Sequence, residues 1–524
     1  MKIAMTGVSG NMGIEAFYQT MELSEVEFIR VLLSNKKKND KFAKKLIKSY
    51  GNRVQIVRGT IADAGNCKRL VEGVDYVIHM AGVIPPASDA NPNASYECNY
   101  LGAKAMVDAV KAANPQPKYV HISTVALYGN RNEKHPFGRV GDPLLVSPYD
   151  YYAMHKLAGE RYCLDADLNE WVVLRQTAML HYNMLKDNVS DGLMFHTAMN
   201  APLEWVSSRD SGYLIKRIIE RDSKGEVAHF WKKIYNIGAG YNCRATGYDT
   251  FNDGFAIIGG TTEKYFKPNW FATRNFHGVW FADSDELEEL FTYQRDGVKD
   301  FWKEIGRRHK IYAAGKIVPA KLIYLFLFKR LLNHPNSPRR WVKDGQIGHS
   351  TAAFGSLEAA QALSSDWKDY KLLSKGDFGD YDEMRKTENA ALLDHGYDES
   401  KVQEDWDISD MRSAAAFRGG EVISQKVEGA YSKIVWKCNC GHEFSASPYT
   451  VLRGGHWCPK CCKPTPWDFD RLSKHNAFFA QAWYDSHEKD EDLLYDLGDN
   501  FKPVLSRLGG NSSARLSKQE EGEK

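Results

Sequence analysis

A glycine-rich loop that joins an apolar strand to a helix restricts the fold of this chain more than any other feature. Lys2–Thr6 is apolar enough for a buried strand, and a helical pattern begins at about Met12. Gly7 permits the tight turn, Gly10 lets the backbone approach a pyrophosphate, and Gly13 lets the helix pack closely on the strand. Glycines also mark ordinary turns, so the prediction depends on the strand–loop–helix context. The pattern predicts a dinucleotide site, with the phosphates at the N-terminus of the helix.

Strands and helices are predicted to alternate through the first third of the chain. Apolar strands are expected at Phe28–Leu33, 53–57, 74–79, 119–123 and 171–175, and helices at about 12–23, 66–72, 94–113 and 147–168. Such alternation implies right-handed crossovers and a doubly wound parallel sheet. The strands are continuous apolar runs, as expected when helices cover both faces. From 183 to about 314 the alternation weakens, which suits a smaller substrate lobe.

The end of the second strand bears on the choice of nucleotide. An acidic residue there would bind the 2′-hydroxyl of NAD, but the first carboxylate after this strand is Asp40. Ser34 can donate a hydrogen bond to a 2′-phosphate, and Lys36 can pair with it. We therefore predict a preference for NADP over NAD. The alternative is a solvated lysine run on a loop.

A tyrosine and a lysine stand four residues apart on a predicted helix. Tyr152 and Lys156 would share one face of this helix. A free phenol has a pKa of about 10, and a neighbouring ammonium group lowers that pKa by stabilising the phenolate. Thr124 or Ser123, at the end of the preceding strand, can hydrogen-bond a reacting oxygen, or can merely cap the strand. The arrangement predicts proton transfer to a carbonyl or from an alcohol.

Together these motifs resemble the extended short-chain dehydrogenase/reductase family, also called the NAD-dependent epimerase/dehydratase family. The matching pieces occur in order over about residues 1–300: 6–13, 77–82, Asn99 with Gly102, 123–129, Tyr152 with Lys156, 172–175, 205–210 and 235–238. The resemblance implies a Rossmann-type α/β fold and a catalytic triad of Thr124, Tyr152 and Lys156. Thr124 is preferred to Ser123 because it lies four residues before Tyr128. Cofactor contacts are expected at Gly7, Ser9, Gly10, Asn11, Met12, Gly13, Ser34, Lys36, Ile61, Ala81, Gly82, Tyr152 and Lys156.

Two departures from the family pattern concern the nucleotide contacts and the residue after the last strand of the core. Gly59 is followed by Thr60 and Ile61 where an aspartate is common, and Gln176 replaces the usual proline after Arg175. These departures affect the expected adenine contacts and leave the expected fold unchanged.

The expected activity is hydride transfer between nicotinamide and a carbonyl/alcohol pair, with Tyr152 as proton donor or acceptor. Dehydratases of the family place acidic residues beside the hydroxyl, and 125–127 supplies none. A nucleotide-sugar epimerase or dehydratase is an alternative, as is a dinucleotide-binding scaffold or a protein that contacts nucleic acid. Aromatic residues between 180 and 280 suit a rather apolar substrate, or form part of the core. The expected partner is a small molecule; a homodimer is left open, and nucleic acid is not expected.

Five of the nine cysteines lie close together near the end of the chain. Cys438 and Cys440 precede Cys458 and Cys461 at a spacing that fits a tetrahedral zinc site. His442 can replace Cys440, because the first pair is Cys-x-Cys. The unit resembles treble-clef or zinc-ribbon modules. Four protein ligands leave no position for water, so a structural zinc is expected, in a small domain that needs metal to fold.

We expect four parts: an NAD(P)-binding and substrate domain at 1–314, a helical connector at 315–420, a zinc-binding module at 421–466 and a helical tail at 467–524 with a disordered end. Segment 317–332 carries basic residues around an apolar stripe, and is expected to be a core or dimer helix, with an interfacial membrane helix as the alternative. Its apolar run is too short to span a bilayer. With a net charge of +2 and no signal peptide, a cytoplasmic protein is expected.

Overall fold

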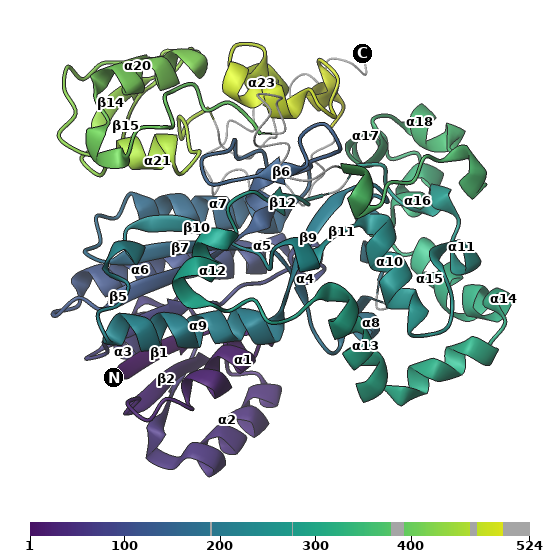
Figure 1. The fold of residues 1–524 in the computed structure, drawn as a ribbon, viewed down its shortest axis with the longest axis horizontal. Helices are drawn as coiled ribbons and strands as arrows, with labels where there is room; N and C mark the ends of the chain where they lie inside the picture. Colours follow the sequence, from purple (N-terminus) through teal and green to yellow (C-terminus); the bar gives the residue numbers. More distant parts are fainter. Residues whose placement is uncertain (189–190, 275, 379–391, 462–468, 496–524) are drawn as a thin grey trace.

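The computed structural model describes residues 1–188, 191–274, 276–378, 392–461 and 469–495, and its centre is a parallel sheet (Figure 1). Seven strands lie in the order β10-β7-β5-β4-β1-β2-β3. Their bounds are β1 (Lys2–Thr6), β2 (Phe28–Leu33), β3 (Val54–Arg58), β4 (Tyr76–His79), β5 (Lys118–Thr124), β7 (Trp171–Gln176) and β10 (Lys233–Ile237). The predicted doubly wound α/β fold is confirmed.

Successive side chains of each strand enter different hydrophobic cores, because side chains alternate between the faces of a sheet. Ile3 and Met5 of β1 belong to the core that includes residues of α1 (Asn11–Thr20) and α9 (Ser208–Ser223). Ala4 belongs to the opposite core, which includes residues of α3 (Ala64–Val71), α6 (Gly102–Ala112) and α7 (Tyr151–Leu164). Helices therefore cover both faces of the sheet, as the apolar strands predict.

Three helices differ from the expectation. The lysine run opens α2 (Lys37–Tyr50), which no sequence pattern led us to predict. The single helix expected at 94–113 consists of α5 (Pro92–Ser95), a π-helical turn at Tyr96–Leu101 and α6. Helix α7 begins at Tyr151 rather than near 147, because the Asp150 carboxylate caps it by accepting a hydrogen bond from the Ala153 amide at 2.9 Å.

The lobe predicted from the sequence to bind substrate, called the substrate lobe below, lies beside the central sheet (Figure 1) and contains a small sheet, β11-β9-β8. Its elements are β8 (Ala178–Leu180), α8 (Met184–Asn188), β9 (Pro202–Ser207), β11 (Arg244–Thr246), α10 (Gly247–Ala256), α11 (Thr262–Tyr265) and α13 (Val298–Arg308). Short elements continue it as a 3-10 segment (Lys310–Ile317), α14 (Ala320–Ile323), a π turn (Tyr324–Phe328), α15 (Lys329–Leu332), α16 (Pro338–Lys343), α17 (Ile347–Phe354) and α18 (Leu357–Ala362). Other short elements are α4 (Ala87–Ala90), β6 (Phe137–Gly138), β12 (Trp280–Phe281) and α12 (Asp285–Phe291).

Among the described residues, no single helix is both long enough and apolar enough to cross a membrane. Two helical segments, Lys310–Ile317 and Ala320–Leu332, reach that length and composition only when taken together, and they are bent by 115° relative to each other.

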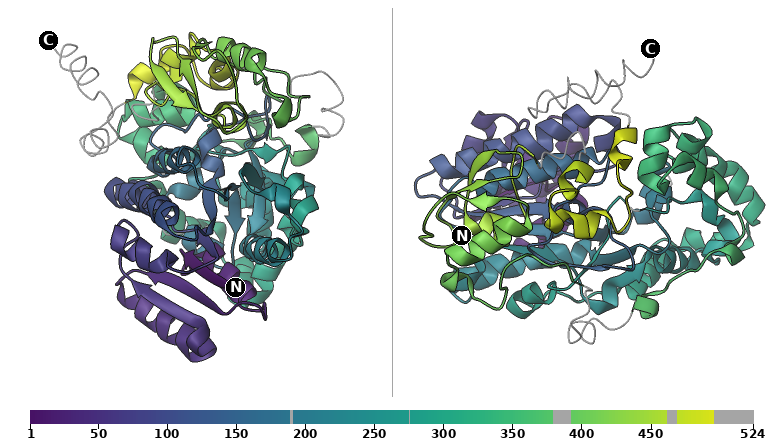
Figure 2. Two further views of the ribbon diagram at one scale, coloured as in Figure 1. Left: turned by 90° about the vertical axis from the view of Figure 1, so that its left-hand side faces the viewer. Right: turned by 90° about the horizontal axis from the view of Figure 1, so that it is seen from above.

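The C-terminal module covers the β10 edge of the sheet (Figures 1 and 2). It contains α20 (Ile408–Phe417), a sheet of β13 (Glu421–Val422), β14 (Ile434–Lys437) and β15 (Glu443–Ala446), and helices α21 (Pro448–Leu452), α22 (Phe469–Ser473) and α23 (Ala477–Trp483). The Tyr449 hydroxyl accepts a hydrogen bond from the Ile234 amide of β10 at 2.8 Å. An edge strand with exposed amides can pair with another chain and cause aggregation. The module covers the edge of the sheet at β10.

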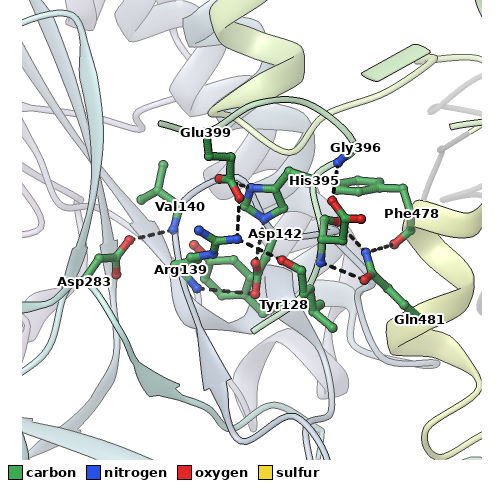
Figure 3. Close-up of polar contacts among 12 residues, drawn as sticks. Tyr128, Arg139, Val140, Asp142, Asp283, His395, Gly396, Glu399, Phe478 and Gln481 are labelled. Atoms are coloured by element: carbon green, nitrogen blue, oxygen red, sulfur yellow. Dashed lines mark hydrogen bonds and ion pairs between the residues drawn. The ribbon is translucent and has the colours of Figure 1, made fainter. Parts of the chain in front are cut away.

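A buried polar cluster joins the connector to the first domain (Figure 3). The His395 ring lies between two carboxylates, with Nε2 2.9 Å from Asp142 and Nδ1 2.7 Å from Glu399. Arg139 pairs with the same Glu399 at 2.6 Å. Burial raises the pKa of Glu399, but His395 and Arg139 outweigh it and lower that pKa to about 2. The connector is thus fixed to the sheet domain by charged groups as well as by apolar packing.

Candidate active site and metal centre

The glycine loop lies at the carboxyl end of β1, beside β4, where the strand order reverses and ligands of such sheets bind. Gly7 has φ 71°, and a Cβ there would lie 2.7 Å from the Met80 carbonyl carbon. A Cβ on Gly13 would lie 2.3 Å from the Gly7 oxygen. The Thr6 hydroxyl accepts hydrogen bonds from the Met80 and Ala81 amides at 3.1 and 3.0 Å. Only glycine therefore fits at positions 7 and 13, where the glycine loop lies against the backbone after β4 and against itself.

The residues predicted to contact the cofactor at the glycine loop differ in their exposure to solvent. Ser9, Gly10 and Asn11 are exposed at the start of α1, whereas Met12 and Gly13 are buried beneath them. The loop containing Ala81 and Gly82 is held from behind by Asn99, whose side chain accepts from the Val83 amide at 2.8 Å and donates to its carbonyl at 2.9 Å. Asn99 lies in the π-helical turn, a feature that often marks functional sites.

A basic site lies where β2 ends. Lys36 is exposed at the N-cap position of α2, and the Ser34 hydroxyl accepts a hydrogen bond from Asn39 at 2.8 Å. Arg58, at the end of β3, donates to the Ser34 carbonyl at 3.4 Å and pairs with Asp40 at 3.0 Å. Sequence reasoning missed Arg58, which the pairing of β2 with β3 brings beside Ser34.

Ile61, a predicted cofactor contact, is buried and packs under α6. A Cβ on Gly102 would lie 2.5 Å from its Cγ2 atom. Its side chain therefore supports the helix that follows the π turn.

The structure brings the three predicted catalytic residues together. Thr124 ends β5, and Tyr152 and Lys156 lie one turn apart on α7. Burial raises the pKa of Tyr152 to about 12, and a hydrogen bond with the Thr124 side chain opposes this rise. Burial lowers the pKa of Lys156 to about 8, and its ammonium group donates to the Ile122 carbonyl. Burial therefore shifts the pKa values of both Tyr152 and Lys156 toward the uncharged form of each group.

Ser123 belongs to a different network, centred on Glu160 of α7. Its hydroxyl donates to Glu160 at 2.5 Å, and Arg175 of β7 pairs with the same carboxylate at 2.6 Å. His456 of the C-terminal module lies 3.1 Å from it, and the Gly454 carbonyl accepts from Arg175 at 2.7 Å. Burial raises the pKa of Glu160, but Arg175 and His456 outweigh it and hold that pKa well below its usual range.

An apolar cavity of about 220 Å³ begins at Val125, the residue after Thr124. Its walls include Ala178, Leu203, Trp205, Phe251, Phe255 and Trp302. No lysine or arginine lines it in the described part of the chain. Its buried carboxylate, Glu204, is neutralised by Arg244 at 3.1 Å.

His277 also lines the cavity, and sequence reasoning did not single it out. Its Nδ1 atom lies 3.5 Å from Asp150, the cap of α7 and two residues before Tyr152. No local pattern marks His277, because its partner is more than a hundred residues away in the chain. The pair therefore connects the cavity wall to the N-terminus of α7.

A second cluster of chemical interest lies in the C-terminal module. The ligand atoms of Cys438, His442, Cys458 and Cys461 all lie within 4.8 Å of one another. His442 Nδ1 is 3.2 Å from the Cys461 sulfur, which is 3.5 Å from the Cys438 sulfur. The predicted ligand Cys440 is exposed and does not belong to this group of four; its sulfur accepts a hydrogen bond from an arginine at 3.3 Å. The structure thus assembles three of the four predicted ligands, together with the histidine that was the alternative.

Sequence similarity to a known protein family lies in the first third of the chain. Residues 3–179 match the model of the NAD dependent epimerase/dehydratase family. The mouse sterol-4-alpha-carboxylate 3-dehydrogenase, decarboxylating, is 28% identical over 115 residues, which cover 22% of this chain and 31% of that protein. The UDP-glucuronate 4-epimerase 3 of Arabidopsis thaliana is 34% identical over 110 residues, which cover 20% of this chain and 25% of that protein. The matched segment therefore spans less than a third of the length of either relative.

Solved structures align with somewhat more than half of this chain. A dTDP-glucose 4,6-dehydratase double mutant from Streptomyces venezuelae, with NAD bound, is 19% identical and covers 59% of this chain and 97% of its own, with a TM-score of 0.48. Residues 3–179 are thus similar in sequence to the NAD dependent epimerase/dehydratase family.

Proposed function

We propose that this chain is an NAD(P)-dependent oxidoreductase that transfers hydride between nicotinamide and a carbonyl/alcohol substrate, with NADP as the preferred cofactor. The observation that carries the proposal is that Tyr152, one turn before Lys156 on α7, hydrogen-bonds Thr124 at the end of β5, next to Val125 in the wall of an apolar cavity.

The residues present fit a dinucleotide. The exposed start of α1 offers amides to a pyrophosphate, and the close approach at Gly7 and Gly13 leaves no room for a side chain. Lys36 and Arg58 would meet a 2′-phosphate, since both lie at the ends of β2 and β3. The bound nicotinamide would supply or accept the hydride.

The protein's own groups would move the proton. Tyr152 would protonate a carbonyl oxygen, or accept the proton of an alcohol, while Thr124 fixes that oxygen. A phenol with a pKa near 12 is a poor base at neutral pH, so Tyr152 needs cationic neighbours to reach the phenolate. Lys156 is one such neighbour, and its own lowered pKa of about 8 still leaves it mostly charged at pH 7.

A nucleotide-sugar epimerase is the second candidate, favoured by the similarity to the Arabidopsis relative. The cavity argues for the oxidoreductase. A sugar nucleotide carries a diphosphate, which arginine or lysine side chains usually bind, and none lines the cavity in the described residues.

We also propose that Cys438, His442, Cys458 and Cys461 hold a structural zinc ion. Bond lengths of about 2.3 Å to sulfur and 2.0 Å to nitrogen place tetrahedral ligands roughly 3.5 Å apart. The distances of 3.2 and 3.5 Å in the cluster fit this value. Four protein ligands leave no position for a reacting water, so the ion would stabilise the module that covers β10.

The test of the oxidoreductase uses the full chain stripped of nucleotide. Titration of its fluorescence with NADPH and NADH should show tighter binding of NADPH, and Arg58→Ala should remove that preference. With NADPH and a panel of apolar ketones, Tyr152→Phe should lower kcat/KM by about 100-fold or more without weakening NADPH binding. Tyr151→Phe, a change at the neighbouring tyrosine, is the matched control. Full turnover by Tyr152→Phe would refute the assignment; sugar-nucleotide epimerisation without net NADPH use would establish the second candidate.

A further inference from the structure

A long stretch of the substrate lobe carries positive charge without any negative charge. Between Glu304 and Asp344 the sequence contains no aspartate or glutamate. Its basic residues are Arg307, Arg308, Lys310, Lys316, Lys321, Lys329, Arg330, Arg339, Arg340 and Lys343. Since the whole chain has a net charge of only +2, the rest of the chain is net negative, and this stretch is a strongly basic segment.

The same stretch exposes large apolar side chains. We call residues 307–332 the basic apolar face. Five side chains of this face are exposed: Ile311 (79%), Ile317 (85%), Leu322 (43%), Leu325 (45%) and Phe326 (81%). Lys310, Lys316, Lys321 and Lys329 are exposed among them. Scattered single apolar residues are ordinary on a protein surface, but a cluster within one segment marks an interaction site.

The face is held in place by its other side. Phe328 and Leu331 are fully buried in a core of the substrate lobe, and the Tyr324 ring stacks on Trp270 with 5.6 Å between centroids. The exposed apolar side chains therefore belong to an anchored, bent element, with 115° between its two parts. Because its inner side is packed against the lobe, its outer side is exposed to solvent.

The face also adjoins the cavity. Phe328 lies 6.4 Å from Phe255, measured between ring centroids, and Phe255 lines the cavity. Phe251 belongs to both the cavity wall and the same core. Aromatic side chains thus pack between this segment and the candidate substrate site (Figure 1 shows α10 beside α15).

We propose that the basic apolar face docks on an anionic lipid bilayer surface. Apolar side chains surrounded by lysine and arginine are the composition that inserts at the boundary of headgroups and acyl chains, and each basic residue is attracted to anionic lipid. A second copy of this chain fits poorly, because a twofold interface would oppose the same positive charges. Nucleic acid would use the lysines but gives no reason to expose Ile317 and Phe326.

The proposal goes beyond the proposed reaction and does not depend on it. Docking would bring the apolar cavity close to a phase in which apolar ketones and alcohols concentrate. Binding to vesicles is measured without cofactor or substrate, so its failure is distinct from a failure of the oxidoreductase assignment.

The test is co-sedimentation of the purified full chain with vesicles. Vesicles of phosphatidylcholine with phosphatidylserine should bind the protein, pure phosphatidylcholine should bind it weakly, and added salt should release it. Lys316→Glu with Lys321→Glu should weaken binding by more than about fivefold per changed residue. Phe326→Ser with Ile317→Ser should weaken it while keeping the circular dichroism spectrum.

The matched control is another lysine-rich exposed helix. Lys44→Glu with Lys48→Glu on α2 makes the same charge change and should leave vesicle binding within about twofold. Equal losses from the two charge variants would show attraction without a docking face and would overturn the proposal. Absence of binding to phosphatidylserine vesicles at low salt would overturn it as well. So would a dimer in light scattering that Phe326→Ser with Ile317→Ser converts to monomers, because a second copy would then cover the face.

Discussion

The buried pair of Glu160 and Arg175 allows a quantitative prediction about stability. Both side chains are completely buried, and their ion pair is 2.6 Å long. Removing one partner leaves the other charge uncompensated in the interior, which costs about 3–5 kcal/mol. We therefore expect Glu160→Leu and Arg175→Met each to lower the free energy of unfolding by about that amount. The double variant has no unpaired charge, so its loss should fall short of the sum by about 2–3 kcal/mol.

The assay is urea unfolding of the four proteins of this cycle, followed by circular dichroism. An exposed pair, Lys104 and Asp108 at 2.8 Å, provides the comparison. Lys104→Met should change the free energy of unfolding by no more than about 0.5 kcal/mol, because solvent screens that pair. If the two buried substitutions cost no more than the exposed one, or if their effects add within about 0.5 kcal/mol, the pair does not have the energetic role assigned to it.

Two further predictions concern the pH dependence of stability and the ligands of the proposed zinc ion. The pKa of Glu399 is lowered to about 2 from a reference of 4.5, so the stability it contributes is present above pH 4.5 and is lost as the pH falls toward 2. The advantage of the wild type over Glu399→Gln in urea unfolding should therefore shrink by about 1 kcal/mol between pH 7 and pH 4; a constant difference would contradict the role of His395 and Arg139 in lowering that pKa. His442→Ala should purify with little zinc, as measured by mass spectrometry of the metal, while Cys440→Ser should keep one zinc ion per chain. Zinc kept by His442→Ala and lost by Cys440→Ser would instead show that Cys440, and not His442, is the fourth ligand.

The central sheet could be predicted from the sequence because its evidence is local. Strands β1 and β2 have the expected bounds, since each is a continuous apolar run that ends at a glycine or a polar turn. Helix α2 was missed because it is dominated by lysine and buries few residues, among them Ala43 and Leu46. The π turn at Tyr96–Leu101 interrupts an otherwise regular helical pattern and leaves no mark in residue types.

The candidate site could be predicted only where its residues share one element or follow a motif. Tyr152 and Lys156 are four residues apart, so their placement on one face follows from helix geometry. Arg58, His277 and His456 reach their positions through pairing and packing of distant segments. A single sequence without homologues gives no measure of such proximity.

The bond between Arg175 and the Gly454 carbonyl has a consequence for synthesis of the protein. The two residues are 279 positions apart. At about 5–20 residues per second, a ribosome needs roughly 15–60 s to travel between them. During that interval the nascent sheet has its edge strand β10 without Tyr449 and its interior guanidinium without one of its acceptors. The last fifth of the polypeptide thus completes a core that the first third began, so the sheet domain reaches its final packing only after most of it has left the ribosome.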